Sequence, residues 1–177
     1  MKVLIVVDAQ NDFISGVLGT PEAEAAIPHI AEKVNAADEN TLIIYTRDTH
    51  NTNYLDTPEG KRLPVEHCIK DTVGWQIDSR VYKDNCLILN KRTFGIRNWD
   101  NILNDIYITT DLLEEIELCG FCTDICVISN ALNLQSYFHT EGVPITVDAK
   151  ACAGVTPEKH NAALDVMESC QINVINR

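Results

Sequence analysis

Cys126 is the residue of this sequence best suited to act as a nucleophile. It follows a predicted strand over 115–121 and falls in the first turn of a predicted helix over 123–138. A thiolate at a helix start faces unpaired backbone N–H groups and the positive end of the helix dipole, and both lower the pKa of a thiol. The same N–H groups can stabilise the oxyanion of a tetrahedral intermediate. The alternative interpretation is a small buried hydrophobic residue, because free cysteines often pack that way.

Two charged residues at the ends of other predicted strands are candidates for activating this thiol. Asp8 follows the apolar run over 2–7, and Lys91 follows a predicted strand over 86–90. In solution a carboxyl group is about 4.6 pKa units more acidic than a thiol. Burial must therefore raise the pKa of Asp8, while a cation and the helix start lower the pKa of the thiol. We expect Asp8 to act as the general base and Lys91 to supply the cation; the alternative for Lys91 is a solvated surface lysine.

Asp48 and His50, together with His67 farther along the chain, form a candidate metal site. Asp48 and His50 are two residues apart beyond a predicted strand over 41–46, so both side chains could face one ion. Carboxylate oxygen and imidazole nitrogen are ligands that suit zinc, iron or manganese. The alternative is that these are ordinary polar residues of a surface loop.

The elements that must position these residues alternate between strands and helices. Such alternation predicts right-handed crossovers and a parallel sheet with helices on both faces. We therefore expect one domain over 1–177, a three-layer α/β/α sandwich with a six-stranded, mainly parallel sheet, and a site beyond the carboxyl ends of the strands. The predicted strands cover 2–7, 41–46, 86–90, 115–121, 143–147 and 172–175, and the predicted helices cover 21–35, 98–110, 123–138 and 156–170.

The composition excludes several classes of function. The chain has 177 residues and a net charge of -12, and it contains no basic run that could form a nucleic-acid-binding surface. No apolar stretch approaches the roughly 18 residues that a membrane span requires. The first apolar run, over 2–7, is too short for a secretory signal, so the seven scattered cysteines are expected to be reduced thiols in the cytoplasm.

Four segments together resemble the isochorismatase-like cysteine hydrolase superfamily, which includes nicotinamidases, N-carbamoylsarcosine amidases and isochorismatases. The resemblance covers nearly the whole chain and implies a catalytic triad of Asp8, Lys91 and Cys126, in which Asp8 takes the thiol proton and the thiolate attacks a carbonyl carbon. It also implies an oxyanion hole formed by the backbone N–H groups of Cys122 and Cys126, a cis peptide near Cys122, and a homo-oligomer, either a dimer or a tetramer. The four segments are Asp8–Phe13, Asn90–Phe94, Gly120–Val127 and Asp148–Ala149.

The nicotinamidase branch of this superfamily implies a more specific function. By that resemblance Asp48, His50 and His67 bind a divalent ion, zinc or else iron or manganese, which holds a pyridine nitrogen. Phe13 matches an aromatic residue that stacks on the substrate ring, and Thr123 is expected to contact the substrate. The expected reaction converts a small carboxamide, nicotinamide or a similar compound, to the carboxylic acid and ammonia through a thioester.

The loop over 48–75 departs from the pattern of that branch. A Trp-Pro-x-His-Cys string is common there, whereas this chain reads Leu63-Pro64-Val65-Glu66-His67-Cys68. The stacking tryptophan is missing, and Trp75 in the same loop is a candidate replacement. The extra residue before His67 makes Glu66 a rival for the place of the third metal ligand.

Two other functions remain open from the sequence. One is a metal-free hydrolase of the same superfamily that acts on an isochorismate-like vinyl ether or on a carbamoyl amide. The other is a thiol redox or metal sensor, which the spacing of Cys119, Cys122 and Cys126 suggests. The sensor requires three sulfurs to converge, although Cys119 is expected inside a strand and apart from the helix start.

Overall fold

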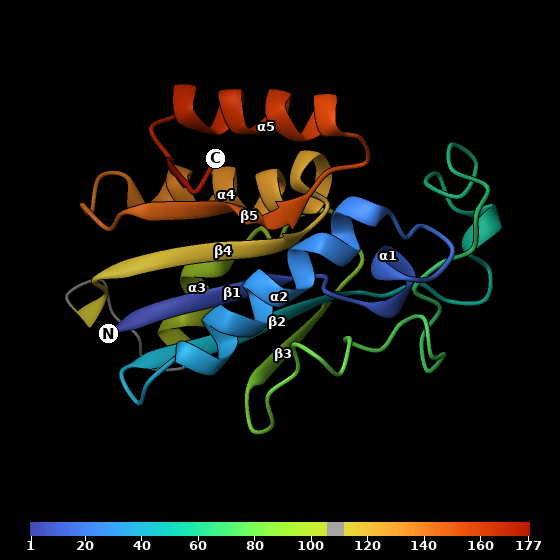
Figure 1. The fold of residues 1–177 in the computed structure, drawn as a ribbon, viewed down its shortest axis with the longest axis horizontal. Coiled ribbons are helices and arrows are strands. Elements are labelled where there is room, and N and C mark those ends of the chain that lie inside the picture. The colour runs from blue at the N-terminus through green and yellow to red at the C-terminus, as the bar shows by residue number, and fades with distance from the viewer. Residues whose placement is uncertain (106–111) are drawn as a thin grey trace.

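The protein is built on a single six-stranded sheet (Figure 1). The computed structural model describes residues 1–105 and 112–177, and the strand order is β3-β2-β1-β4-β5-β6. Every neighbouring pair of strands is parallel, so the expected α/β fold is confirmed and its sheet is parallel throughout. The strands are β1 (Lys2–Val7), β2 (Thr41–Asp48), β3 (Leu87–Lys91), β4 (Glu115–Phe121), β5 (Ile145–Ala153) and β6 (Asn173–Ile175).

Helices cover both faces of the sheet, with α2 in front and α3 behind in Figure 1. Two of the longer helices begin as their sequences predict, because a threonine side chain caps the helix and a proline follows it: Thr20 caps α2, and Thr156 caps α5. The α-helices are α1 (Asn11–Ile14), α2 (Pro21–Ala36), α3 (Trp99–Asp105), α4 (Ile128–Phe138) and α5 (Pro157–Ser169).

Several predicted boundaries differ from the structure. The predicted helix over 123–138 is a π-helical turn, η3 (Thr123–Val127), followed by α4. The predicted strand over 143–147 begins later and extends as β5 to Ala153. The end of the predicted helix over 98–110 lies outside the described residues. Two short helices were not predicted, α1 and the 3₁₀ turn η1 (Tyr54–Asp56), because neither is long enough to show a periodic pattern.

The sheet places β1 at its centre, which explains why this strand is apolar along its length. Residues 3–7 are all buried, because neighbouring strands and helices cover β1 on every side. The chain runs outward from β1 in one direction through β2 and β3, and in the other through β4, β5 and β6. Ligands of open α/β sheets bind beyond the carboxyl ends of the strands at the point where the order reverses, here between β1 and β4.

Gly120 allows β4 to pass close to β1 at this point. Its φ is +118°, and a Cβ atom there would lie 2.0 Å from the carbonyl oxygen of Val7. The peptide bond between Phe121 and Cys122 is cis, as the resemblance implied for this region. The end of β4 can therefore lie this close to β1 only because residue 120 has no side chain. No helix among the described residues combines the length and apolar character that a membrane crossing needs.

Candidate active site

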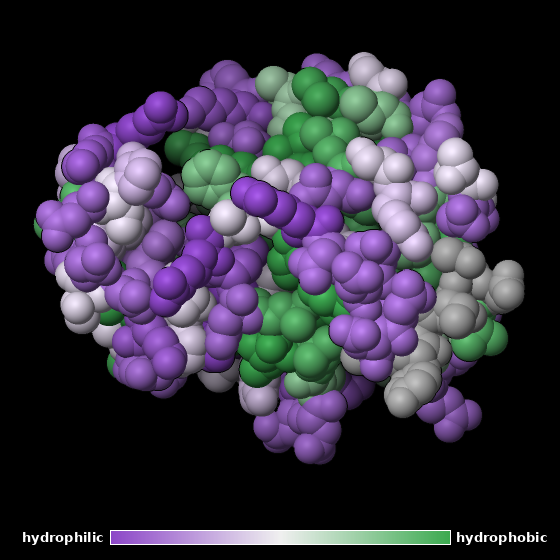
Figure 2. Space-filling view, turned by 180° about the vertical axis from the view of Figure 1, so that it is seen from behind, coloured by the Kyte–Doolittle hydropathy of each residue, from purple (hydrophilic) through white to green (hydrophobic). Residues whose placement is uncertain are grey.

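Cys126 lies in η3, between the end of β4 and the start of α4, and its side chain is buried. The residue lines a cavity of about 750 Å³. Figure 2 shows a hollow between the loop region that follows β2 and the rest of the molecule, with strongly hydrophilic side chains at its edge. The thiol is therefore at the wall of a cavity large enough for a small-molecule ligand.

The structure brings Asp8, Lys91 and Cys126 into contact. Lys91 Nζ lies 2.6 Å from Asp8 Oδ2 and donates a hydrogen bond of 3.5 Å to Cys126 Sγ. The other carboxylate oxygen of Asp8, Oδ1, accepts a hydrogen bond of 2.7 Å from Thr46 Oγ1. Apart from the ion pair, Oδ2 has no hydrogen-bond partner among the described residues. It therefore has a lone pair with which it can accept a proton.

The buried thiol rests in its protonated form. Burial raises the pKa of Cys126 well above its usual value; the carboxylate of Asp8 raises it further, and the ammonium group of Lys91 opposes the rise. The net pKa of this thiol is therefore raised, because desolvation and the neighbouring carboxylate outweigh the cation; a lowering effect of the helix start stays a prediction.

The two charged members of the group form an ion pair. Burial raises the pKa of Asp8, as expected, although Lys91 acts in the opposite direction. Burial disfavours the charged form of Lys91, but the negative charges around it, first that of Asp8, keep the pKa of Lys91 above its usual value. The resting arrangement is thus a thiol beside a carboxylate–ammonium pair.

Asn130, which sequence reasoning did not single out, holds η3 in place. Its side chain is fully buried, and Nδ2 donates a hydrogen bond of 2.8 Å to the carbonyl oxygen of Cys126. Oδ1 accepts hydrogen bonds from the backbone N–H of Ile96 (3.0 Å) and from Nε1 of Trp99 (3.1 Å). A buried asparagine in a helix is a signal of such a network, but the sequence does not show that the residue is buried.

Thr123 and Asp124 connect η3 to the start of α5. Thr123 Oγ1 is 2.8 Å from His160 Nδ1, and Asp124 Oδ1 accepts a hydrogen bond of 2.9 Å from the backbone N–H of Val155. Thr123 is buried and is not among the described residues that line the cavity. The substrate contact expected for Thr123 stays a prediction, since in the structure its hydroxyl bonds His160 of α5.

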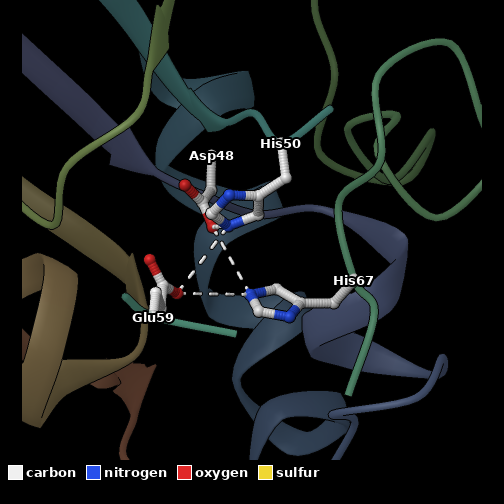
Figure 3. Close-up of side chains that lie close together, drawn as sticks. All are labelled: Asp48, His50, Glu59 and His67. Atoms are coloured by element: carbon white, nitrogen blue, oxygen red, sulfur yellow. Dashed lines mark hydrogen bonds and ion pairs between the residues drawn. The ribbon is translucent and has the colours of Figure 1, made fainter. Parts of the chain in front are cut away.

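A cluster of four side chains lies against the same cavity: Asp48, His50, Glu59 and His67 (Figure 3). One potential ligand atom from each lies within 4.8 Å of all the others. Asp48, Glu59 and His67 line the cavity that Cys126 also lines. The three ligands expected from the sequence are thus brought together, and a fourth joins them.

The fourth member of the cluster is Glu59 and not Glu66, which was a rival to His67 for the third position. Glu66 is exposed and lies outside the cluster, whereas Glu59 is half-buried and its Oε1 lies 3.8 Å from His67 Nε2. His67 is buried in the cluster, whereas the neighbouring Glu66 is exposed to solvent.

The geometry of this cluster fits a divalent metal ion. Asp48 Oδ2 lies 2.9 Å from His50 Nε2 and 3.6 Å from His67 Nε2. His67 Nδ1 is 2.8 Å from the carbonyl oxygen of Val65, which assigns the proton to Nδ1 and leaves the lone pair of Nε2 directed at the other ligands. Burial disfavours the charge of Asp48, yet the hydrogen bond from His50 and the positive charge of Lys91 hold the pKa of this carboxyl well below its usual range. Two imidazoles and two carboxylates suit zinc, iron or manganese.

Aromatic and aliphatic side chains form most of the remaining cavity wall. Phe13 is buried there, with its ring centroid 5.6 Å from that of His67 in an edge-on arrangement. Trp75 does not replace the missing tryptophan, because it is not among the described lining residues and its Nε1 donates to Thr49 Oγ1 at 2.8 Å. The apolar residues of the wall include Phe13, Leu18, Leu63, Phe94, Phe121, Ile125 and Val155.

The three cysteines of the sensor hypothesis do not share one environment. Cys122 and Cys126 line the cavity, and burial raises the pKa of Cys122 to about 12. Cys119 is buried inside β4, near Cys152 and Lys33, and does not line the cavity. The arrangement therefore gives no support to a site made from all three sulfurs.

Comparison with known proteins finds the same family by sequence and by structure. The model of the isochorismatase domain matches residues 2–177. The nicotinamidase of Saccharomyces cerevisiae is 26% identical, and the match covers all of both chains; the nicotinamidase/pyrazinamidase of Mycobacterium tuberculosis is also 26% identical and covers 99% of this chain and 98% of its own. The crystal structure of the pyrazinamidase of Pyrococcus horikoshii in complex with zinc is 27% identical, with a TM-score of 0.79 over 99% of each chain.

Proposed function

The chain belongs to the isochorismatase family, and on this premise we propose that it hydrolyses nicotinamide or a similar small carboxamide to the carboxylic acid and ammonia. The observation that carries the proposal is one cavity lined both by Cys126, in contact with Lys91 and the Asp8 ion pair, and by the carboxylate–imidazole cluster. The relatives named nicotinamidase and pyrazinamidase support this choice of substrate.

The proposed reaction begins with transfer of the thiol proton of Cys126 to Asp8 Oδ2. The sulfur then forms a bond to the carbonyl carbon, and the C=O electron pair moves onto the oxygen, which the backbone N–H groups of Cys122 and Cys126 are proposed to stabilise. Lys91 lies within 3.5 Å of the sulfur, so its positive charge stabilises the thiolate as it forms. The raised pKa of Cys126 means that the thiolate exists only transiently.

The second half of the reaction returns the proton. The C–N bond breaks, and the amine takes the proton from Asp8 and leaves as ammonia, with a thioester on Cys126. Asp8, again a carboxylate, removes a proton from water, which adds to the thioester carbonyl. Collapse of that intermediate breaks the C–S bond, releases the carboxylic acid and restores the thiol of Cys126.

The four candidate metal ligands orient the substrate in this proposal. Asp48, His50, Glu59 and His67 would hold the ion, which when bound supplies a Lewis acid for a lone pair of the substrate ring. Phe13 beside His67 contributes an apolar surface for that ring, and the wall residues Phe121 and Ile125 exclude water around it.

The metal-free alternative leaves this cluster without a role. An isochorismate-like or carbamoyl-amide hydrolase would not need two buried imidazoles and two carboxylates within 4.8 Å of one another. The cluster therefore favours the metal-dependent amidase.

Ammonia release from nicotinamide, pyrazinamide and carbamoyl amides tests the proposal. We expect release from the ring carboxamides, loss of release after chelation with recovery on addition of zinc, iron or manganese, and a loss of at least about a thousandfold in Cys126→Ala. Cys119→Ala is the matched control, because Cys119 is a buried thiol that does not line the cavity. Full ammonia release by Cys126→Ala, with Cys119→Ala equally active, would exclude Cys126 as the nucleophile.

A further inference from the structure

Three basic side chains surround the cavity and come from separate parts of the chain: Arg62, Arg92 and Lys159. All three are exposed. Arg62 follows Glu59 by one turn, its backbone N–H donating to the Glu59 carbonyl oxygen at 2.9 Å, and Arg92 directly follows Lys91. The basic rim is thus attached to the same segments that supply the metal cluster and the ion pair.

The carboxylates of the cavity do not neutralise this basic rim. Asp48 pairs with the histidines of the metal cluster and lies 3.8 Å from Lys91, and Glu59 lies near the same histidines. Within residues 1–105 and 112–177, none of the three rim cations has a carboxylate oxygen within 4.0 Å. In a chain of net charge -12, three uncompensated cations around one cavity form a local positive field.

The position of Lys159 adds a second argument. It lies in the first turn of α5, a helix of 13 residues, where its backbone N–H donates to the capping hydroxyl of Thr156. A cation at this end of a helix is unfavourable because it faces the positive end of the helix dipole. An anion bound beside Lys159 would interact favourably both with the lysine and with the helix terminus.

The cavity also has more room than a single-ring carboxamide needs. Its volume of about 750 Å³ lies in the upper part of the range of pockets for drug-sized ligands. Its lining includes the reactive groups, apolar residues such as Leu18 and Phe94, and the three cations of the basic rim. Phe94 is 48% exposed, so an apolar surface continues outward from the cavity towards solvent.

From these observations we infer that the preferred substrate is an extended carboxamide that carries an anionic group, a carboxylate or a phosphate, at the end remote from the amide. The inference rests on the proposed function and narrows its substrate class. The amide lies at Cys126, the ring and its chain follow the apolar wall, and the anion lies among Arg62, Arg92 and Lys159.

Matched substrates test this inference. Nicotinamide is extended at the ring by a flexible chain that ends in a carboxylate, in a phosphate monoester or, as the neutral partner, in a hydroxyl group. We expect kcat/KM for one of the two anionic compounds to exceed that of the neutral partner by about tenfold at low ionic strength, and the ratio to fall as salt is added. The anionic compound with the higher kcat/KM shows whether the site prefers a carboxylate or a phosphate.

Variants assign the preference to the basic rim. In Arg62→Gln/Arg92→Gln/Lys159→Gln we expect the ratio of anionic to neutral kcat/KM to approach one. Lys61→Gln is the control, because Lys61 is an exposed neighbour of Arg62 that is not among the described lining residues, and the ratio should stay as in the wild type. Equal kcat/KM for anionic and neutral compounds in the wild type would overturn the inference, as would a preference that survives in the triple variant.

Binding measurements separate this inference from the proposed function. Calorimetric titration of Cys126→Ala with the same three compounds requires no turnover. If no carboxamide releases ammonia, the proposed function is wrong. The anion site is still supported if an anionic compound binds Cys126→Ala more tightly than the neutral compound does, and if this difference disappears when Arg62, Arg92 and Lys159 are also replaced by glutamine. Equal binding of the anionic and neutral compounds rejects the anion site whatever the activity.

Discussion

Replacement of Asn130 by alanine should destabilise the fold, because this side chain holds η3, the turn that carries Cys126. Asn130 is fully buried and makes four hydrogen bonds of 2.8–3.3 Å, to the carbonyl oxygens of Cys126 and Phe94, the N–H of Ile96 and the indole N–H of Trp99. Alanine removes all four bonds and leaves four polar groups without their partner. These groups belong to η3, to the segment before α3 and to α3, so one side chain joins three parts of the structure.

The expected size of the effect follows from these four contacts. Each hydrogen bond contributes about 1 kcal/mol net, and a buried partner left unsatisfied costs about 1–3 kcal/mol. Because water can reach some of the vacated space, we expect Asn130→Ala to lower the free energy of unfolding by about 3–4 kcal/mol. With a urea slope of about 2 kcal/mol/M, the unfolding midpoint should shift down by about 2 M.

Urea unfolding followed by circular dichroism measures this change, and Asn133→Ala provides the matched control. Asn133 lies one turn later on α4, is exposed, and donates a single hydrogen bond of 2.9 Å to the carbonyl oxygen of Ile96. Its replacement should cost at most about 1 kcal/mol. If Asn130→Ala loses no more stability than Asn133→Ala, at an unchanged slope, the role assigned to Asn130 is wrong.

Three further predictions follow from other contacts. Gly120→Ala should yield little folded protein in a solubility and circular dichroism assay, because the new Cβ would lie 2.0 Å from a carbonyl oxygen of β1; wild-type yield would contradict this. Glu59→Gln should weaken zinc binding at least about tenfold in a competition titration with a fluorescent chelator, whereas Glu66→Gln should leave it unchanged. Burial raises the pKa of Asp148, but Lys33 outweighs this effect and holds the pKa of Asp148 below its usual value. The ion pair therefore stabilises the fold at any pH above the unfolded-state pKa of about 3.9, and this stabilisation is lost as the pH falls through the lower folded-state pKa. The stability difference between wild type and Lys33→Met should therefore be full at neutral pH and shrink below about pH 4 in urea titrations; a pH-independent difference would refute the assignment.

The parts of the fold that could be predicted from sequence are those where pattern and burial agree. β1 is a continuous apolar run because the centre of a parallel sheet is buried on both faces, so its sequence identifies both the strand and its position. Asp8 and Lys91 were predicted to lie near Cys126 because the carboxyl ends of parallel strands meet at one edge of the sheet. The order of strands then brings these residues into contact.

The parts that could not be predicted depend on the path of irregular backbone or on tertiary burial. Glu59 reaches the other three ligands through turns that have no periodic pattern, so the sequence pointed only to Glu66, the neighbour of His67, as a rival ligand. In the sequence Asn130 cannot be told from an exposed polar residue of a helix, because its burial depends on the packing of α3. The pKa of Cys126 was expected to fall because the helix start is visible in the sequence, whereas complete desolvation is not.

The protonated state of the buried Cys126 thiol has a consequence for chemical labelling. Alkylating reagents react with thiolates, so their order of attack on this chain should follow exposure rather than catalytic role. Cys170 is exposed, and should be modified first, while Cys126 remains intact in the resting protein. A compound that carries its electrophile into the cavity and occupies the amide position would reverse that order, because proton transfer to Asp8 can then be coupled to formation of the new bond. The ratio of label on these two cysteines would thus report how selectively a covalent inhibitor uses the catalytic arrangement.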